Sequence, residues 1–220
     1  MAEKYGTVPK KFTSAWWEYF WDYYKWHTIA TVFVAGCIGI TAYQCATREV
    51  YDTSVTYGGK LVFDTESTTR LELAFEENTS DADKNGEVNV FFMPCSINNE
   101  DQANAEYNMA VMTKLDLSLQ DETSYLFIYD KAQLDAQIAR ETFTEAFVPV
   151  DEWVKNPDAQ NIINWENSDF AYCLKDSKIL NDAGVKCDDM YAVLKGCYSD
   201  KPEALASFES AKELALAISQ

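Results

Sequence analysis

The sequence predicts an α/β protein with a single N-terminal transmembrane helix and one three-layer α/β domain whose sheet is mostly parallel. Three observations predict it: an uncharged run near the N-terminus, strand-like and helical segments that alternate after it, and acidity confined to that later part. The expected division is a cytoplasmic and interfacial aromatic segment (1–25), a transmembrane helix (26–47) and an acidic extracellular domain (48–220).

The transmembrane helix is predicted from a run of 22 residues between Lys25 and Arg48, in which His27 is the only side chain able to carry a formal charge near neutral pH. At about 1.5 Å per residue this run gives roughly 33 Å of helix, and the hydrocarbon core of a bilayer is about 30 Å thick. The run is therefore long enough to span a membrane.

The same segment contains the sequence VAGC, which ends at Cys37 and is typical of the cleavage and lipidation site of a lipoprotein. A secretory signal has a short apolar stretch and then a polar mature start, but here the apolar run continues past Cys37 as IGITAY. An uncleaved span is favoured, and a lipoprotein is the alternative.

The residues before the span predict its orientation. Residues 1–47 hold four lysines against three acidic side chains, and positive flanks stay in the cytoplasm, so the N-terminus is expected inside and residues 48–220 outside. Eight of residues 16–26 are Trp, Tyr or Phe, which settle at headgroup depth. A polar face at helical spacing completes an amphipathic helix at the inner surface: Ser14, Glu18, Asp22 and Lys25.

Small residues recur every four positions on one face of the span, at Thr31, Ala35 and Gly39. Such spacing lets a second helix approach closely, so these residues are predicted to form a helix–helix contact with another copy or with another membrane protein. The alternative is an ordinary single span.

In the outer domain, apolar and β-branched runs alternate with helical patterns in the order β-α-β-α-β-α. Strands joined by helical crossovers pair in parallel, with right-handed connections, which is why a mostly parallel sheet is expected. The predicted segments are strands at 53–57, 87–93 and 124–129, and helices at 63–78, 100–120 and 130–140.

Residues 141–167 interrupt this alternation. The segment holds two prolines and four aromatic side chains predicted to be exposed, which are typical of interface cores: Phe143, Phe147, Trp153 and Trp165. Two more strands are predicted at 169–174 and 190–195, and Pro202 marks the start of a last helix that buries Leu205, Phe208, Ala211, Ala215 and Ile218.

The strand VTYGG, the acidic loop with Asn-Gly and the strand SYLFIYD together resemble the first lobe of extracellular solute-binding proteins of ABC transporters. The later DFAYCLKDSKILNDAGV and MYAVLKG look like the part of that lobe reached after the chain returns from the second lobe. With the WWEYFWDYYKWH lead-in, the chain resembles uncharacterised single-pass membrane proteins of Gram-positive bacteria with such an ectodomain. The resemblance implies a one-lobe fold, because only residues 141–167 stand where a second lobe would be.

Charge and composition exclude several classes of function. From residue 49 onward there are 13 basic and 33 acidic side chains, which argues against nucleic acid as a partner because its binding depends on neutralising phosphates. The only histidine, His27, lies at the membrane boundary, so the outer domain has no imidazole for a catalytic triad or a zinc site. No enzyme motif is found. A carboxylate-based hydrolase is the one class of enzyme considered that the composition does not exclude.

The loop DADKNGEV has the spacing of a calcium loop. Asp81, Asp83 and Asn85 take the first, third and fifth ligand positions, and the Glu87 carbonyl takes the seventh. Phe92 stands at the twelfth position, where a bidentate Glu is usual, so a carboxylate from elsewhere is needed. A Ca²⁺ site is one hypothesis, and a polar Asn-Gly turn without a metal is the other.

Six cysteines are present, and none forms a C-x-x-C pair. Cys187 and Cys197 lie in the outer domain, where oxidation is possible, and they are candidates for a disulfide. Free buried thiols are the alternative.

These observations favour a membrane-anchored extracellular interaction module that serves as an accessory subunit of a larger membrane assembly. Its expected partners are the bilayer and either other membrane proteins or a second copy. Two alternatives belong to other classes: a solute receptor for an ABC-type transporter, and a surface hydrolase.

Overall fold

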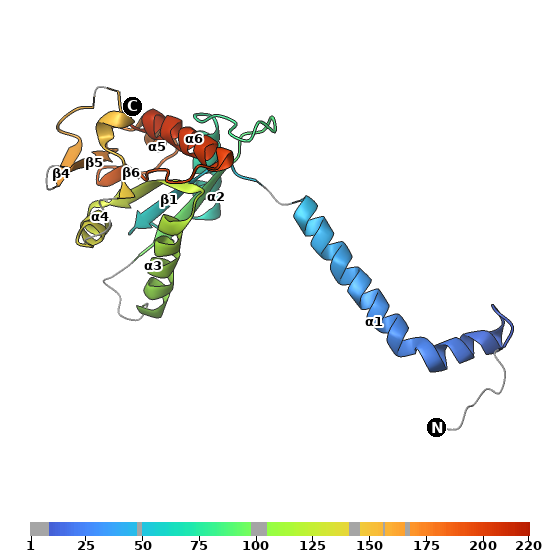
Figure 1. Ribbon diagram of the computed structural model, residues 1–220. Helices are drawn as coiled ribbons and strands as arrows, with labels where there is room; N and C mark the ends of the chain where they lie inside the picture. Colours follow the sequence, from blue (N-terminus) through green and yellow to red (C-terminus); the bar gives the residue numbers. More distant parts are fainter. Residues whose placement is uncertain (1–8, 48–49, 98–104, 141–145, 156, 166–167) are drawn as a thin grey trace. The chain divides into compact units, whose positions relative to one another are not determined.

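The chain folds into two compact units, Met1–Glu49 and Val50–Gln220. The computed structural model describes residues 9–47, 50–97, 105–140, 146–155, 157–165 and 168–220 (Figure 1).

The first unit is one helix, α1 (Ser14–Ala46), which joins the predicted interfacial segment and the predicted span without interruption and bends in its N-terminal third (Figure 1). Thr13 caps its start by accepting a hydrogen bond from the Trp16 N–H at 3.3 Å. The helix is long and apolar enough to cross a bilayer, with a mean hydropathy of 1.7 over its most apolar stretch. Membrane anchors and signal sequences share this length and composition.

The second unit is an α/β domain built on a six-stranded sheet in the order β2-β1-β3-β6-β5-β4. Its elements are β1 (Thr53–Gly59), α2 (Thr65–Glu76), β2 (Val90–Ser96), α3 (Ala105–Gln120), β3 (Ser124–Asp130), α4 (Lys131–Ile138), the 3₁₀ helix η3 (Val150–Glu152), β4 (Ile162–Trp165), β5 (Ser168–Cys173), α5 (Lys178–Asp182), β6 (Met190–Leu194) and α6 (Pro202–Ile218).

The sheet is mixed, so the expectation of a mostly parallel sheet is wrong. β1 pairs in parallel with β2 and with β3, as the helical crossovers predicted. The three later strands are antiparallel to their neighbours. The reason is that parallel neighbours need a crossover of a dozen or more residues, whereas only two residues separate β4 from β5 in the sequence.

Helices cover both faces of the sheet and give three layers. On one face, α2, α5 and α6 bury a core that includes Phe75, Leu180 and Leu214. On the other face, α3 and α4 bury Leu115, Leu134 and their neighbours. β1 lies between β2 and β3 and is buried along its whole length, as a strand covered on both faces must be.

Two predicted helix faces are only partly right. On α3, Leu115 is buried, but Met109 is 73% exposed because the N-terminal half of the helix extends beyond the sheet. On α6, Ala211, Ala215 and Ile218 are buried, whereas Leu205 is exposed.

The edge strand β2 has its outward backbone donors capped by side chains of α2. The Val90 N–H donates to Glu76 at 3.3 Å, and the Phe92 N–H donates to Glu72 at 3.1 Å. Pro94, the next residue in that alternation, has no N–H to offer. Another strand therefore finds few free donors along this edge of the sheet.

Candidate functional site

The predicted calcium loop is a tight turn that bonds to itself. Asp81 accepts hydrogen bonds from the backbone N–H groups of Asn85 and Gly86, and Asp83 accepts from the Asn85 N–H and from its side-chain amide. The Asn85 side-chain oxygen accepts from the Glu87 N–H at 2.7 Å. Lys84 and Gly86 adopt positive φ angles of 60° and 92°, which closes the turn.

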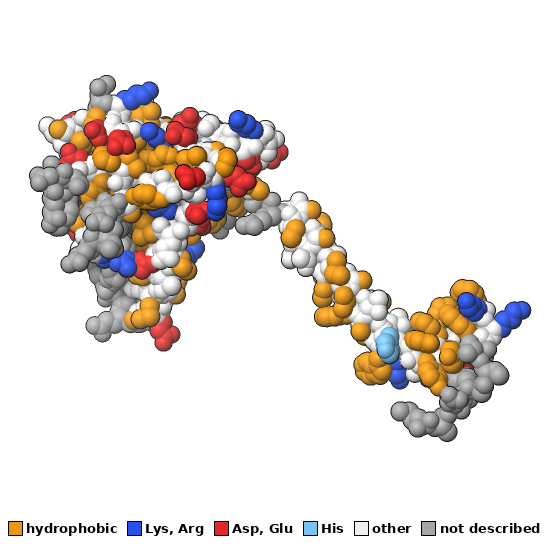
Figure 2. Space-filling model, viewed as in Figure 1, with side chains coloured by type: hydrophobic (Ala, Val, Ile, Leu, Met, Phe, Trp, Pro, Cys, Tyr) orange, Lys and Arg blue, Asp and Glu red, His pale blue; other side chains and the backbone are white. Residues whose placement is uncertain are grey.

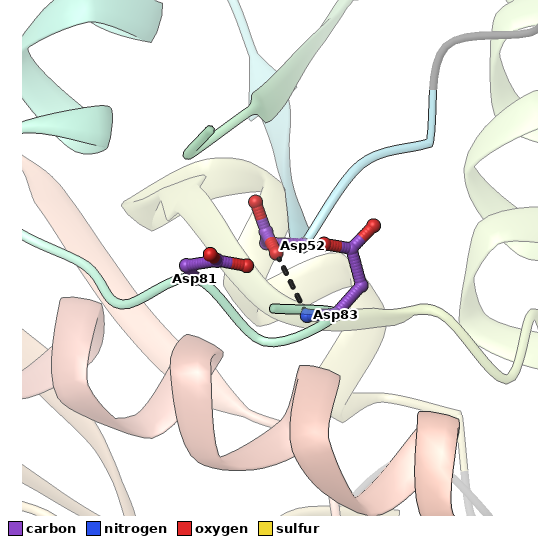
Figure 3. Close-up of side chains that lie close together, drawn as sticks. All are labelled: Asp52, Asp81 and Asp83. Atoms are coloured by element: carbon purple, nitrogen blue, oxygen red, sulfur yellow. Dashed lines mark hydrogen bonds between the residues drawn. The ribbon is translucent and has the colours of Figure 1, made fainter. Parts of the chain in front are cut away.

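Asp52, one residue before β1, places a third carboxylate beside the loop. One oxygen of each of Asp52, Asp81 and Asp83 lies within 4.8 Å of the others. Figure 3 shows these three side chains gathered at the loop, with the hydrogen bond from the Asp83 N–H to Asp52 drawn. No local pattern marked Asp52, because it is about thirty positions away along the chain.

Asp52 is buried and accepts three backbone hydrogen bonds, from Ala82 at 2.7 Å, Asp83 at 3.2 Å and Asn89 at 2.8 Å. It therefore fastens the loop to the start of the central strand. Bonds to a charged acceptor are about twice as strong as neutral ones, so Asp52 is a structural anchor whether or not a cation is bound.

The three carboxylates suit a hard cation, which prefers several oxygen ligands. Hydrogen bonding from the Gly86 N–H is the largest cause that lowers the pKa of Asp81, so this group stays ionised and is poorly suited to act as a general acid. The backbone N–H groups of Asn85 and Glu87 donate hydrogen bonds within the turn, to Asp83 and to the Asn85 side chain. Calcium binding by Asp81, Asp83, Asn85 and Glu87 stays a prediction, now with Asp52 as an added ligand.

The expected exposed aromatic surface is wrong for two of its four members. Phe147 and Trp153 are 8% and 3% exposed. Phe147 packs between Phe127 and Phe170, with ring centroids 6.2 and 6.1 Å away, and Trp153 packs edge-on to Tyr172 at 6.3 Å. Both complete the core because the Val148 N–H bonds to Leu194 and draws this segment against β6.

The other two members stay predictions. Phe143 and the side chain of Trp165 lie outside the described residues.

The small-residue face of α1 is exposed at Thr31, Ala35 and Gly39. No atom outside the local helix backbone comes within 4 Å of a Cβ built on Gly39. A second helix has room to approach there, and the predicted helix–helix contact stays a prediction.

The predicted disulfide is not formed, because Cys187 and Cys197 are free thiols. Their side chains contact different groups: Cys187 lies beside the Lys175 carbonyl and Asn181, whereas Cys197 lies 3.5 Å from the Tyr125 hydroxyl. Cys187 packs in the core, and burial raises its thiol pKa.

Lys195, which the sequence reasoning missed as a special residue, is a buried lysine beside a cavity of about 230 Å³. Its ammonium group donates to the backbone carbonyls of Leu119, at 3.2 Å, and Asp121, and it lies 5.2 Å from the centre of the Tyr125 ring. Leu119 lies in the last turn of α3 and Asp121 directly follows the helix, so Lys195, the residue after β6, caps the C-terminus of α3. Burial nevertheless lowers the pKa of Lys195 to about 8, although Asp121, Cys197 and Glu122 act in the opposite direction.

The anchoring role of Asp52 predicts a large loss of stability for Asp52→Ala. Removing the carboxylate leaves three backbone donors without an acceptor, and we expect a loss of about 2–4 kcal/mol in the free energy of unfolding. Asp83→Ala, which removes an exposed carboxylate of the same cluster, is the control and should cost under about 1 kcal/mol. Thermal unfolding followed by near-UV circular dichroism measures both, and equal losses would contradict the anchor.

The cation hypothesis predicts that millimolar Ca²⁺ raises the unfolding temperature of the full chain in a concentration-dependent way. Asp83→Asn should reduce this rise, because it removes one charged ligand while keeping the shape. Glu66→Asn is the control outside the loop. An unfolding temperature that is the same with Ca²⁺ and with a chelator would leave the metal-free turn as the correct interpretation.

Lys195 predicts a pH dependence of stability. Its pKa is lowered from 10.5 in the unfolded chain to about 8 in the fold, so between these values the unfolded chain binds the extra proton and stability attributable to Lys195 rises with pH. The wild type should therefore gain stability relative to Lys195→Met from pH 8 to about 10.5. A stability difference between the wild type and Lys195→Met that stays constant across this pH range would contradict the lowered pKa of Lys195.

Comparison of the chain with family models, with curated proteins and with solved structures gave no match. The candidate site is therefore interpreted from its own geometry.

Proposed function

We propose that the chain is a membrane-anchored extracellular interaction module and an accessory subunit of a larger membrane assembly. In this proposal α1 stays in the bilayer with its N-terminus in the cytoplasm, and the α/β domain, akin to one lobe of a solute-binding protein, stands outside.

One observation carries the proposal: α1 is long and apolar enough to cross a bilayer, and none of its described residues is buried. Its aromatic and aliphatic side chains lie on the surface, as the view in Figure 2 shows for one face. Covering a large apolar side chain is worth about 1.5–3 kcal/mol, so a helix with so many of them favours a bilayer over water.

The aromatic N-terminal part of α1 supports an interfacial position. Phe12, Trp16, Phe20 and Tyr24 stack in a row along the helix, with successive ring centroids 5.5, 5.4 and 5.6 Å apart. The Trp and Tyr rings of this row are amphipathic and favour headgroup depth. Lys10, Lys11 and Lys25 flank or follow this row, which favours the cytoplasmic side.

An accessory role is favoured over solute capture because a one-lobe domain has no cleft between lobes. The domain must then recognise its partner with its surface, and the span can contribute a helix–helix contact at Thr31, Ala35 and Gly39.

Chemical crosslinking in native membranes tests the accessory role. The full chain should be captured with a second membrane protein or a second copy, and the triple variant Thr31→Leu, Ala35→Leu, Gly39→Leu should reduce capture several-fold, because larger side chains keep helices apart. The matched control changes Ile29, Phe33 and Ile40 to Leu, on the opposite side of the same helix. A wild-type chain that remains monomeric in membranes would contradict the proposal.

A further inference from the structure

A groove of about 640 Å³ lies between the segment that contains η3 and one face of α6. Residues 151–155 and Pro157 line one wall, and the other wall is lined by Glu209, Lys212, Glu213 and Leu216. Its size is that of pockets that hold ligands, which are typically about 300–1,000 Å³.

Carboxylates stand on both walls. Asp151 and Glu152 belong to η3, and Glu209 and Glu213 lie one turn apart on α6. Two lysines, Lys155 and Lys212, also line the groove. Within the described part of the chain, none of these six charged groups has an oppositely charged group within ion-pair distance.

Four negative charges against two positive ones, on a domain that is itself strongly acidic, give the groove a negative potential. A cationic ligand complements that potential. An anion or nucleic acid would be repelled by it.

Trp153 adds an independent indication of a ligand. It lines the groove, it is 3% exposed, and its indole N–H has no hydrogen-bond partner among the described residues. An unsatisfied buried donor costs about 1–3 kcal/mol, which a ligand carbonyl would recover. Val154, Pro157 and Leu216 add apolar surface beside it.

We propose that this groove binds an extended cationic peptide segment of a partner protein. A peptide offers lysine or arginine side chains to the four carboxylates and backbone carbonyls to Trp153, Lys155 and Lys212, which a simple polyamine cannot do. Recognition by groove side chains also fits the capped edge of β2, where Glu72 and Glu76 already occupy backbone donors that an added strand would use. The inference rests on the proposed interaction function and adds the chemistry of the partner.

Fluorescence anisotropy with the full chain in detergent micelles tests it. The probe is a labelled, end-capped eight-residue peptide of alternating Lys and Ala, compared with the same peptide carrying Gln for Lys. The Lys peptide should bind to the wild-type chain. The double variant Glu209→Gln, Glu213→Gln should bind this peptide about tenfold or more weakly, because two charge contacts are lost. Both side chains are exposed, so the variant should keep the wild-type unfolding temperature.

The matched control is Glu77→Gln with Glu106→Gln, which removes two exposed carboxylates outside the groove and should leave affinity within about twofold.

Equal weakening of peptide binding by both pairs of substitutions would show diffuse attraction to an acidic surface and overturn the site. Binding of spermine as tightly as the Lys peptide would overturn the peptide assignment. Normal crosslinking of the membrane partner by a groove variant that no longer binds the peptide would also overturn it, while leaving the proposed function intact.

Discussion

The structure depends on one constraint: α1 is a long apolar helix, and none of its described residues is buried. Burying about ten such side chains is worth of order 10 kcal/mol or more, which is comparable to the whole stability of a small domain. In the proposed anchor, the aromatic row from Phe12 to Tyr24 and the nearby lysines lie at the membrane interface. A bilayer is the proposed environment because it suits both the apolar run and this aromatic end.

The α/β domain holds together by a different means, since its core closes without α1. The central strand is covered on both faces, and Asp52 fixes the acidic loop to its first residues through three backbone hydrogen bonds. At the far end of the same strand, Asp130 accepts from the Lys60 N–H at 2.7 Å and also caps α4. Carboxylates thus accept structural hydrogen bonds at both ends of β1. Other carboxylates accept backbone hydrogen bonds along the edge of β2 or line the groove beside α6. The acidity of the domain is therefore partly structural.

The sequence predicted α1, β1 and β3 well because each carries its own signal: an uncharged run, or β-branched and aromatic residues bounded by turns. It failed where the signal is not local. The short hairpin strand β4 and the five-residue α5 leave little periodicity, and strand direction after residue 141 depends on the connection rather than on composition. The sequence predicts Phe147 and Trp153 as surface aromatics, but the structure buries both. The backbone hydrogen bond from Val148 to Leu194 holds their segment against β6, and no local sequence pattern predicts that contact. Asp81 and Asp83 were found from their spacing, whereas Asp52 and Lys195 act across contacts between distant parts of the chain.

The most direct measurement of the central claim is the intact mass of the mature protein extracted from the membranes of its own cells. If α1 remains as the anchor, mass spectrometry should find a mature chain that still contains residues 14–46. A mature chain that begins at a lipid-modified Cys37, or one cut after the apolar segment, would show that α1 is a signal and would contradict the account.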